Sequence, residues 1–150
     1  RGLLAGLNSC ESEAEVFELL HAELAASLDS QRWVWIDEEQ GKAARIVDDW
    51  PLESGIRIEG LPPEEQRLLE RARRSTRVTR VDGGRTPAPD APDASACIGF
   101  ALKEGGRRVL TVLVFVKTTR CSAVLALLRE IQPGLHLAIR RIRDAEARAL

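Results

Sequence analysis

Apolar residues recur at helical spacing near the start of the chain. Residues 1–8, RGLLAGLN, carry three leucines at that spacing and indicate the end of an incoming helix. SEAE at 12–15 is a capping box, in which the Ser12 hydroxyl accepts from the Glu15 amide and the Glu15 carboxylate reaches back. An apolar stripe follows, at Phe17, Leu20, Leu24 and Leu28. This pattern predicts an amphipathic helix.

The middle of the chain instead has the composition of paired strands. RWVWID, EEQGK and AARIVDD, residues 32–49, predict a β-hairpin that turns at Gly41, and residues 96–117 predict a second one around Gly105 and Gly106. Between the hairpins, residues 61–75 predict a helix with Pro63 in its first turn, and residues 77–82 a short strand. Residues 50–60 and the Gly, Pro and Asp-rich residues 83–95 are expected to form loops, the second of them exposed.

A long helix is predicted for the remainder of the chain. Its apolar residues alternate by four and three, which is typical of a heptad seam and not only of a core stripe. We interpret this seam as a dimer and transmitter helix: Val124, Leu128, Ile131, Leu135, Ala138, Ile142, Ala145 and Ala149. Pro133 cannot donate a backbone hydrogen bond, so we expect a kink or a short break there.

This order of elements predicts an α/β fold, an α+β sandwich. The antiparallel sheet would carry the N- and C-terminal helices on one face, and the middle helix with the loops on the other. A PAS-like domain is the alternative on architecture alone, and the long helices at both ends favour the first arrangement.

Three stretches resemble a GAF domain, and they carry a resemblance that extends over essentially the full length of the chain. SEAEVFELLHAELAASL (12–28) is similar to the opening helix of that family, and LLERARRSTRVTRVD (68–82) to its helix followed by a strand that ends in Asp. SACIGFALKEGGRRVLTVLVFV (95–116) is similar to its closing hairpin, with Ala101 where the family often has Pro and Thr111 where it often has Gly. The resemblance implies a regulatory module that binds a small molecule or only dimerises, and that signals to an attached domain.

Composition and charge narrow the possible functions. The 150 residues are 44% apolar, which suits one domain with a single core, and the net charge of −1 argues against non-specific nucleic-acid binding. The longest strongly apolar run, residues 109–116, is too short to span a membrane, and no signal peptide opens the chain. We therefore expect a cytoplasmic domain from a longer protein.

Cysteine and histidine offer little catalytic or metal chemistry. Cys10, Cys97 and Cys121 are widely spaced and predict small buried thiols, not a disulfide framework or a zinc site. His21 and His136 are expected in the helical layer. We predict no metal, no catalytic residues and no enzyme activity, and no cofactor is identified.

Aromatic and arginine side chains are the candidates for ligand contact. Trp33 and Trp35 share one face of a strand, and we expect them in the core more than in a ligand platform. Trp50 is a better candidate than either of them for a lid over the ligand pocket. The alternative is that Trp50 is a hydrophobic plug over the edge of the sheet. Arg77 and Arg80, within an arginine-rich segment, suit an anionic ligand, whereas a solvated helix face explains most of that segment. The predicted ligand contacts are Trp50, Arg77, Arg80, Cys97 and Phe100.

The sequence as a whole predicts a regulatory GAF-like domain of a bacterial-type signalling protein. It would bind an unidentified small molecule, for which the arginine pattern favours an anion. It would also form a homodimer and relay the signal through a helical bundle to an output domain. The first alternative is a dimerisation module with a filled pocket. A third is a methionine sulfoxide reductase-type enzyme that uses Cys97.

Overall fold

A computed structural model describes residues 2–27, 30–50, 63–82, 95–104 and 108–149. The predicted loops at 50–60 and 83–95 lie outside these ranges except for Trp50 and Ser95, which belong to strands and not to loops. No helix within them is long and apolar enough to cross a membrane.

Five strands form one antiparallel sheet in the order β2-β1-β5-β4-β3. The strands are β1 (Ser30–Glu39), β2 (Arg45–Trp50), β3 (Thr79–Arg80), β4 (Ser95–Glu104) and β5 (Arg108–Lys117). The two predicted hairpins are therefore confirmed as β1–β2 and β4–β5. They join into one sheet because β1 of the first hairpin pairs with β5 of the second. Gly41 in the first turn has φ 84°, a left-handed conformation that glycine adopts without steric cost.

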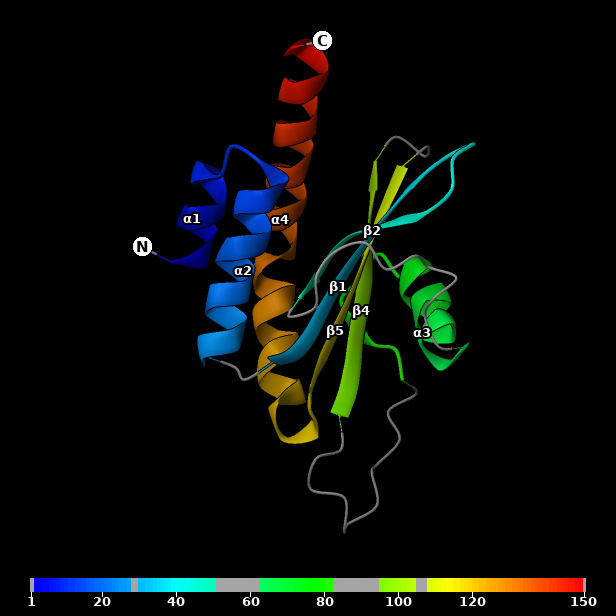
Figure 1. Cartoon of the computed structure of the whole chain (residues 1–150). Helices are drawn as coiled ribbons and strands as arrows, with labels where there is room; N and C mark the ends of the chain where they lie inside the picture. The colour runs from blue at the N-terminus through cyan, green and yellow to red at the C-terminus, as the bar shows by residue number, and fades with distance from the viewer. Residues whose placement is uncertain (1, 28–29, 51–62, 83–94, 105–107, 150) are drawn as a thin grey trace.

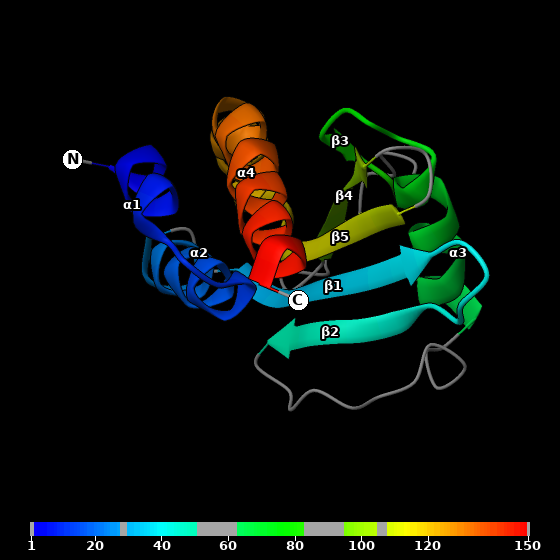
Figure 2. The ribbon, with the colours of Figure 1, turned by 90° about the horizontal axis from the view of Figure 1, so that it is seen from above.

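Helices cover the two faces of the sheet unequally (Figures 1 and 2). On one face lie α1 (Leu3–Ser9), α2 (Glu13–Ser27) and α4 (Cys121–Ala149), with α4 preceded by a 3₁₀ turn, η2 (Thr118–Arg120). On the other face lies α3 (Pro63–Arg73). The predicted α/β sandwich is confirmed, with its terminal helices together on one face.

The N-terminal capping box is present as the sequence predicts. The Glu15 amide donates to Ser12 Oγ at 3.2 Å, and Glu15 Oε2 accepts from the amides of Ser12 and Glu11 at 3.0 and 2.7 Å. These bonds satisfy amides that have no partner within the first turn of α2. The helix therefore begins where the sequence pattern begins.

The larger core lies between the sheet and the terminal helices. Trp33 and Trp35 are buried there, and Trp35 packs on Phe17 with ring centroids 4.8 Å apart. The prediction that both tryptophans belong to the core is confirmed. His21 lies beside them on α2, with its ring edge toward Trp33 and Nε2 2.7 Å from Asp48 Oδ2, so it ties α2 to β2.

The heptad seam of α4 packs inside this same core. Val124, Leu128 and Leu135 have no exposed surface, and Ile131, Ala138 and Ile142 are also buried against the sheet and α1. The interpretation of these six residues as a dimer seam is corrected: a second copy cannot reach side chains that the domain itself covers. The expected break is also wrong, since α4 continues through Pro133 between the buried anchors Ile131 and Leu135.

The docking of α3 depends on a glycine in β4. A Cβ atom at Gly99 would lie 2.6 Å from Ala72 Cβ on α3, and 3.1 and 3.2 Å from side-chain carbons of Val81 and Leu113. Nearby, the Ala101 amide donates to the Ser75 carbonyl at 2.7 Å. The helix therefore lies as close to the sheet as the two backbones allow.

Gly99→Ala is expected to destabilise the domain. The added methyl overpacks the contact with Ala72 and forces α3 outward, at a cost of about 1–3 kcal/mol in the free energy of unfolding. Urea unfolding would measure the change, with Gly2→Ala as the control because its new methyl meets no atom within 4 Å. Equal midpoints for the two variants would contradict this account of α3 docking.

Candidate functional site

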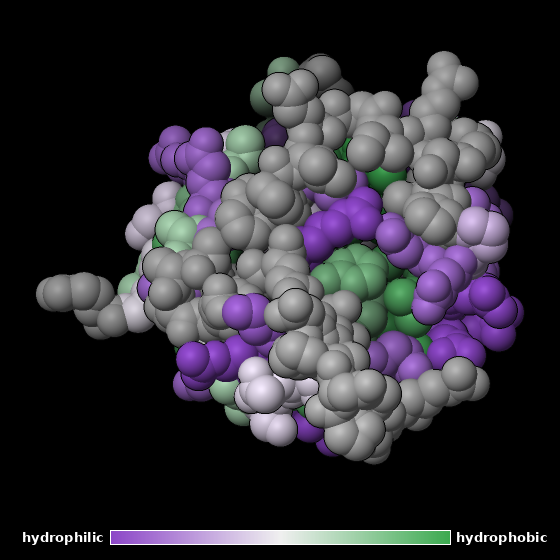
Figure 3. Space-filling view, turned by 60° about the horizontal axis from the view of Figure 1, so that its bottom comes forward, coloured by the Kyte–Doolittle hydropathy of each residue, from purple (hydrophilic) through white to green (hydrophobic). Residues whose placement is uncertain are grey.

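The candidate site is the face of the sheet that α3 covers. Strand alternation sends Trp33 and Trp35 toward the terminal helices, so their neighbours Arg32, Val34 and Ile36 lie on the α3 face. Val34 and Ile36 belong to a second, smaller apolar cluster, and Arg32 lies beside it. The cluster consists of Val34, Ile36, Ile46, Leu69, Ala72, Val81, Cys97 and Leu113, with Phe115 packed against them. Figure 3 shows a patch of hydrophobic atoms at the surface, bordered by hydrophilic ones.

An ion triad crosses this face. Arg32 on β1 donates to both carboxylate oxygens of Asp49 on β2, at 3.0 and 2.9 Å, and its Nη1 reaches Glu65 Oε1 on α3 at 2.6 Å. The Asp49 side chain is fully buried, and the Arg32 side chain is 19% exposed. The hydrogen bond to Asp49 raises the pKa of Arg32 above its ordinary value. Burial opposes this effect, and the charges of both carboxylates add to it. Arg32 therefore remains a fixed cation and ties α3 to the sheet.

The triad borders an aromatic ring. The Arg32 guanidinium carbon lies 5.7 Å from the centroid of Phe115, which is within the range of a cation–π interaction. The ring and the guanidinium together make a surface that is apolar on one side and charged on the other. Such a surface suits a ligand that carries both an apolar and a polar part.

A buried hydroxyl lies on the same face without a partner among the described residues. Thr111 Oγ1 in β5 accepts and donates no hydrogen bond there, and the residue has no exposed surface. Thr111 pairs with Ile36 on one side and Ala101 on the other, both of them apolar. A buried polar group with no partner costs free energy, so a ligand or water that satisfies it gains that amount.

A second ion pair lies at the β3 edge. Arg80 Nε donates to Asp82 Oδ1 at 2.6 Å, and Asp82 Oδ2 accepts from the Cys97 amide at 3.2 Å. The hydrogen bond to Asp82 raises the pKa of Arg80. Because Asp82 already balances Arg80, this guanidinium is less open to an anion than the sequence pattern suggests.

The structure brings together only part of the predicted contact set. Arg80 and Cys97 meet through Asp82, whereas Arg77 is exposed between α3 and β3. Phe100 has no exposed surface and packs with the terminal helices, because it is three residues from Cys97 and so lies on the opposite face. Trp50 ends β2 opposite Trp33, and its side chain lies outside the described residues.

Cys97 lacks the properties of a nucleophile. The side chain is buried, and this burial, with the nearby carboxylates of Asp82 and Glu65, raises the pKa of the thiol far above its ordinary value. The thiolate is the reactive form of cysteine, so Cys97 is held in its unreactive form at neutral pH. The structure thus gives no support to the reductase alternative.

Sequence reasoning missed the residues that shape this face. Arg32, Asp49, Glu65 and Thr111 were not among the candidates. Arg32 and Thr111 carry a usable signal, since each is a polar residue at a position where strand alternation expects an apolar one. The pairing of Arg32 with Glu65 carries no such signal, because 33 positions separate the two residues.

Comparison with solved structures identifies the fold. The chain is similar to the LBD domain of VqsR from Pseudomonas aeruginosa, with a TM-score of 0.62 and 11% identity over 93% of this chain and 95% of that one. It is also similar to CepR2 from Burkholderia cenocepacia, an N-acylhomoserine lactone dependent LuxR family transcription factor, with a TM-score of 0.51 and 14% identity over 92% and 89%.

The fold that these neighbours share with this chain is a mixed α/β fold with an antiparallel sheet. Neither is a GAF domain by its description, so the resemblance to that family stays a prediction. No protein-family model and no curated protein matches the chain.

Arg32→Gln is expected to destabilise the domain strongly. The change leaves the fully buried Asp49 carboxylate without its cation, a situation that costs about 3–5 kcal/mol in comparable pairs. Chemical denaturation would measure the loss, and the double variant Arg32→Gln/Asp49→Asn should recover part of it. Arg74→Gln, at an exposed position, is the matched control. A loss no larger than that of the control would contradict the assignment.

Proposed function

We propose that this chain is the ligand-binding sensory domain of a bacterial regulatory protein. It binds a small molecule on the α3 face of the sheet and relays the signal through α4 to an attached output domain. The observation that carries the proposal is the unpartnered hydroxyl of Thr111 on an apolar face that Arg32 and Asp49 border. The likeness to VqsR and CepR2 supports a sensory use of the fold.

The chemistry of this face favours an amphipathic ligand. Its apolar part is the smaller core cluster with Phe115. The ion triad lies at one end of this cluster, and Thr111, opposite Ile36, lies on the far side of the Val34–Leu113 pair. N-acylhomoserine lactones have an apolar tail and a polar ring, and CepR2 depends on such a molecule. This class therefore belongs in the first ligand panel, beside nucleotides, cyclic dinucleotides, amino acids and organic acids.

Relay through α4 has a structural basis in its contacts with the segment that follows α3. Gln132 Nε2 donates to the Thr76 carbonyl at 2.6 Å, and Arg129 Nε donates to the Val78 carbonyl at 3.0 Å. The Val78 amide in turn donates to Gln132 Oε1 at 3.4 Å. A ligand that changes the position of α3 acts on α4 through these bonds, provided that it binds one arrangement better than the other.

Self-association is proposed through the outer surface of α1 and α4. Leu137 and Leu4 are the exposed large hydrophobic residues among those described, at 64% and 42%. A Cβ atom at Gly134 would lie 2.6 Å from Leu4 Cδ2, so Leu4 lies over the turn of α4 that precedes Leu137. The two leucines thus form one apolar surface, which replaces the buried heptad seam as the proposed dimer contact.

A dimerisation module with a filled pocket is the second candidate function. The observation that favours it is the close packing of Ala72 on Gly99, together with the buried side chains of Val34, Ile36 and Leu113 beneath α3. In that case Thr111 is simply a tolerated buried hydroxyl.

Thr111→Val separates these two functions. Without ligand, the variant should be more stable by about 1–2 kcal/mol, because it removes an unsatisfied buried hydroxyl. A panel ligand that raises the unfolding temperature of the native protein should raise that of Thr111→Val less, and Thr79→Val on β3 should respond like the native protein. Thermal unfolding measures both effects. A panel without any shift would contradict the sensory function and favour the dimerisation module.

Leu137→Lys tests the dimer surface. A charge in the centre of an apolar contact loses the burial that drives association, so the variant should be a monomer at concentrations where the native chain is a dimer. Sedimentation equilibrium measures the mass, and Gln40→Lys in the exposed β1–β2 turn is the control. A native chain that stays monomeric, or a variant that stays dimeric, would contradict this surface.

A further inference from the structure

A charged cavity lies beside the turn of the β1–β2 hairpin and the start of β5, away from the ion triad of Arg32. Its volume is about 360 Å³, within the range of small-molecule sites. The lining residues are Asp37, Glu39, Lys42, Ala43, Arg45 and Arg108. Three of them are cations and two are carboxylates, so the lining carries a net positive charge.

The carboxylates of this cavity are already occupied. Arg108 donates to both oxygens of Asp37, at 3.1 and 2.7 Å, and Arg143 Nη2 reaches Asp37 Oδ1 at 3.4 Å. Glu39 pairs with Lys42 at 3.0 Å. Burial alone would raise the pKa of Asp37, yet the hydrogen bond from Arg108 and the charges of Arg143, Arg108 and Arg45 lower it. The surroundings of this buried carboxylate are therefore strongly positive.

The two arginines, in contrast, keep donors that no described residue accepts from. Arg45 is 70% exposed and lies 3.7 Å from Asp37, too far for a hydrogen bond, and it donates to no other described residue. Arg108 uses Nε and Nη2 on Asp37, which leaves Nη1 without a partner among the described residues. Two guanidiniums with free donors beside one cavity form a setting for oxygen anions, which accept paired hydrogen bonds from arginine.

From this geometry we infer that the hairpin cavity is an anion-binding site, separate from the α3 face. Its ligand is a small multivalent anion with phosphate or carboxylate oxygens, held between Arg45 and Arg108. Asp37 holds Arg108 in position from behind, so that Arg108 is oriented before the anion arrives.

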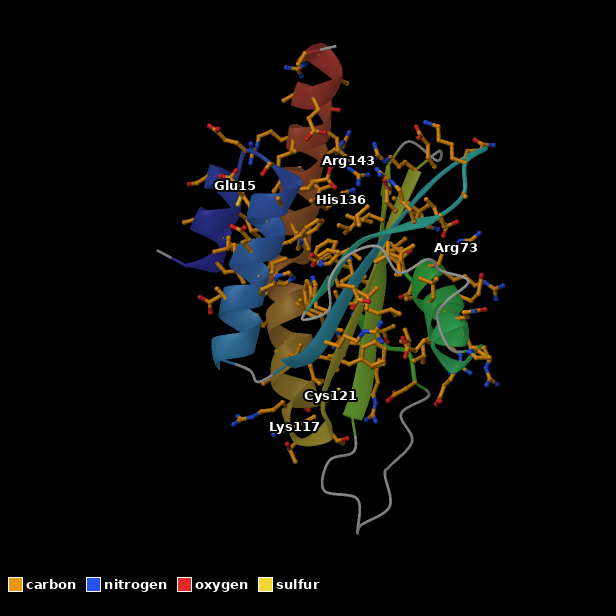
Figure 4. The ribbon with its side chains drawn as sticks, in the orientation of Figure 1. Glu15, Arg73, Lys117, Cys121, His136 and Arg143 are labelled. Carbon is orange, nitrogen blue, oxygen red and sulfur yellow. The ribbon has the colours of Figure 1, made fainter. Side chains whose placement is uncertain are left out.

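This site is joined directly to α4. Arg143 contacts Asp37 from α4 and donates to both oxygens of Glu13 on α2, at 3.2 and 3.0 Å. Figure 4 shows Arg143 on the half of α4 nearer its C-terminal end, on the side toward the sheet. An anion between Arg45 and Arg108 changes the charge balance around Asp37. It thereby changes the strength of the Asp37–Arg143 ion pair, which links the hairpin to α4.

Isothermal titration calorimetry of the whole chain with pyrophosphate and, separately, citrate tests the inference. Ionic strength is held constant with sodium chloride, because general screening would otherwise imitate a specific effect. We expect saturable binding of one or both anions, and the two arms distinguish a phosphate preference from a carboxylate preference. Arg45→Gln should weaken the binding about tenfold or more, since it removes a charge-assisted hydrogen bond from an exposed residue.

The matched control is Arg77→Gln, which removes another exposed arginine that the sequence pattern associates with anions. Binding should be unchanged in Arg77→Gln and also in Thr111→Val, which separates this site from the α3 face. Absence of saturable binding by both anions would overturn the inference. Equal weakening by Arg45→Gln and Arg77→Gln would overturn it too, because that outcome indicates only the general field of the surface.

Discussion

The alternation of side chains along β1 is the constraint on which the rest of the structure depends. This strand lies inside the sheet and is covered on both faces, so its buried apolar side chains belong to one of two clusters. Trp33 and Trp35 enter the terminal-helix core, while Val34 and Ile36 enter the core beneath α3. A shift of register by one residue would exchange the two sets and place indoles where α3 must approach closely.

Each polar cluster occupies the end of one of these faces. On the α3 face, Arg32 precedes Val34 and closes the apolar cluster with Asp49 and Glu65. On the other face, Asp37 follows Trp35 and closes the larger core with Arg108 and Arg143. Burial makes both clusters costly when a partner is lost, so they fix how α3 and α4 lie on the sheet.

Local signals predicted the elements and their order, but not which surfaces meet. The capping box at Ser12, the turn at Gly41 and the two hairpins depend on neighbours in sequence, and each is observed. The face chosen by Trp33 and Trp35 could not be predicted, since period-two alternation defines two sets without assigning them. The dimer prediction for the heptad seam failed for a similar reason. The spacing of its apolar residues fits a second copy of the helix or the core of the same domain equally well, and here the seam packs on the sheet of the same chain.

The candidate contacts were predicted with mixed success because they depend on distant parts of the chain. Cys97 and Phe100 seemed to share a pocket, but three positions along a strand place them on opposite faces. Arg80 was expected to face an anion, whereas Asp82, two positions away, already holds it. Arg45 and Arg108, which keep donors without a partner among the described residues, come from different hairpins and meet only because β1 pairs with both β2 and β5.

The position of α4 explains how one helix can respond to both ends of the sheet. Gln132 and Arg129 bind the backbone between α3 and β3, while Arg143, on the half of the helix nearer its C-terminal end, binds Asp37. The buried residues from Leu135 to Ile142 lie between these attachments, and their close packing allows little independent movement of the two parts of the helix. If ligands bind as proposed at either end, they act on the same rigid element, and the effect of each is limited to the difference in its affinity for two arrangements of that helix.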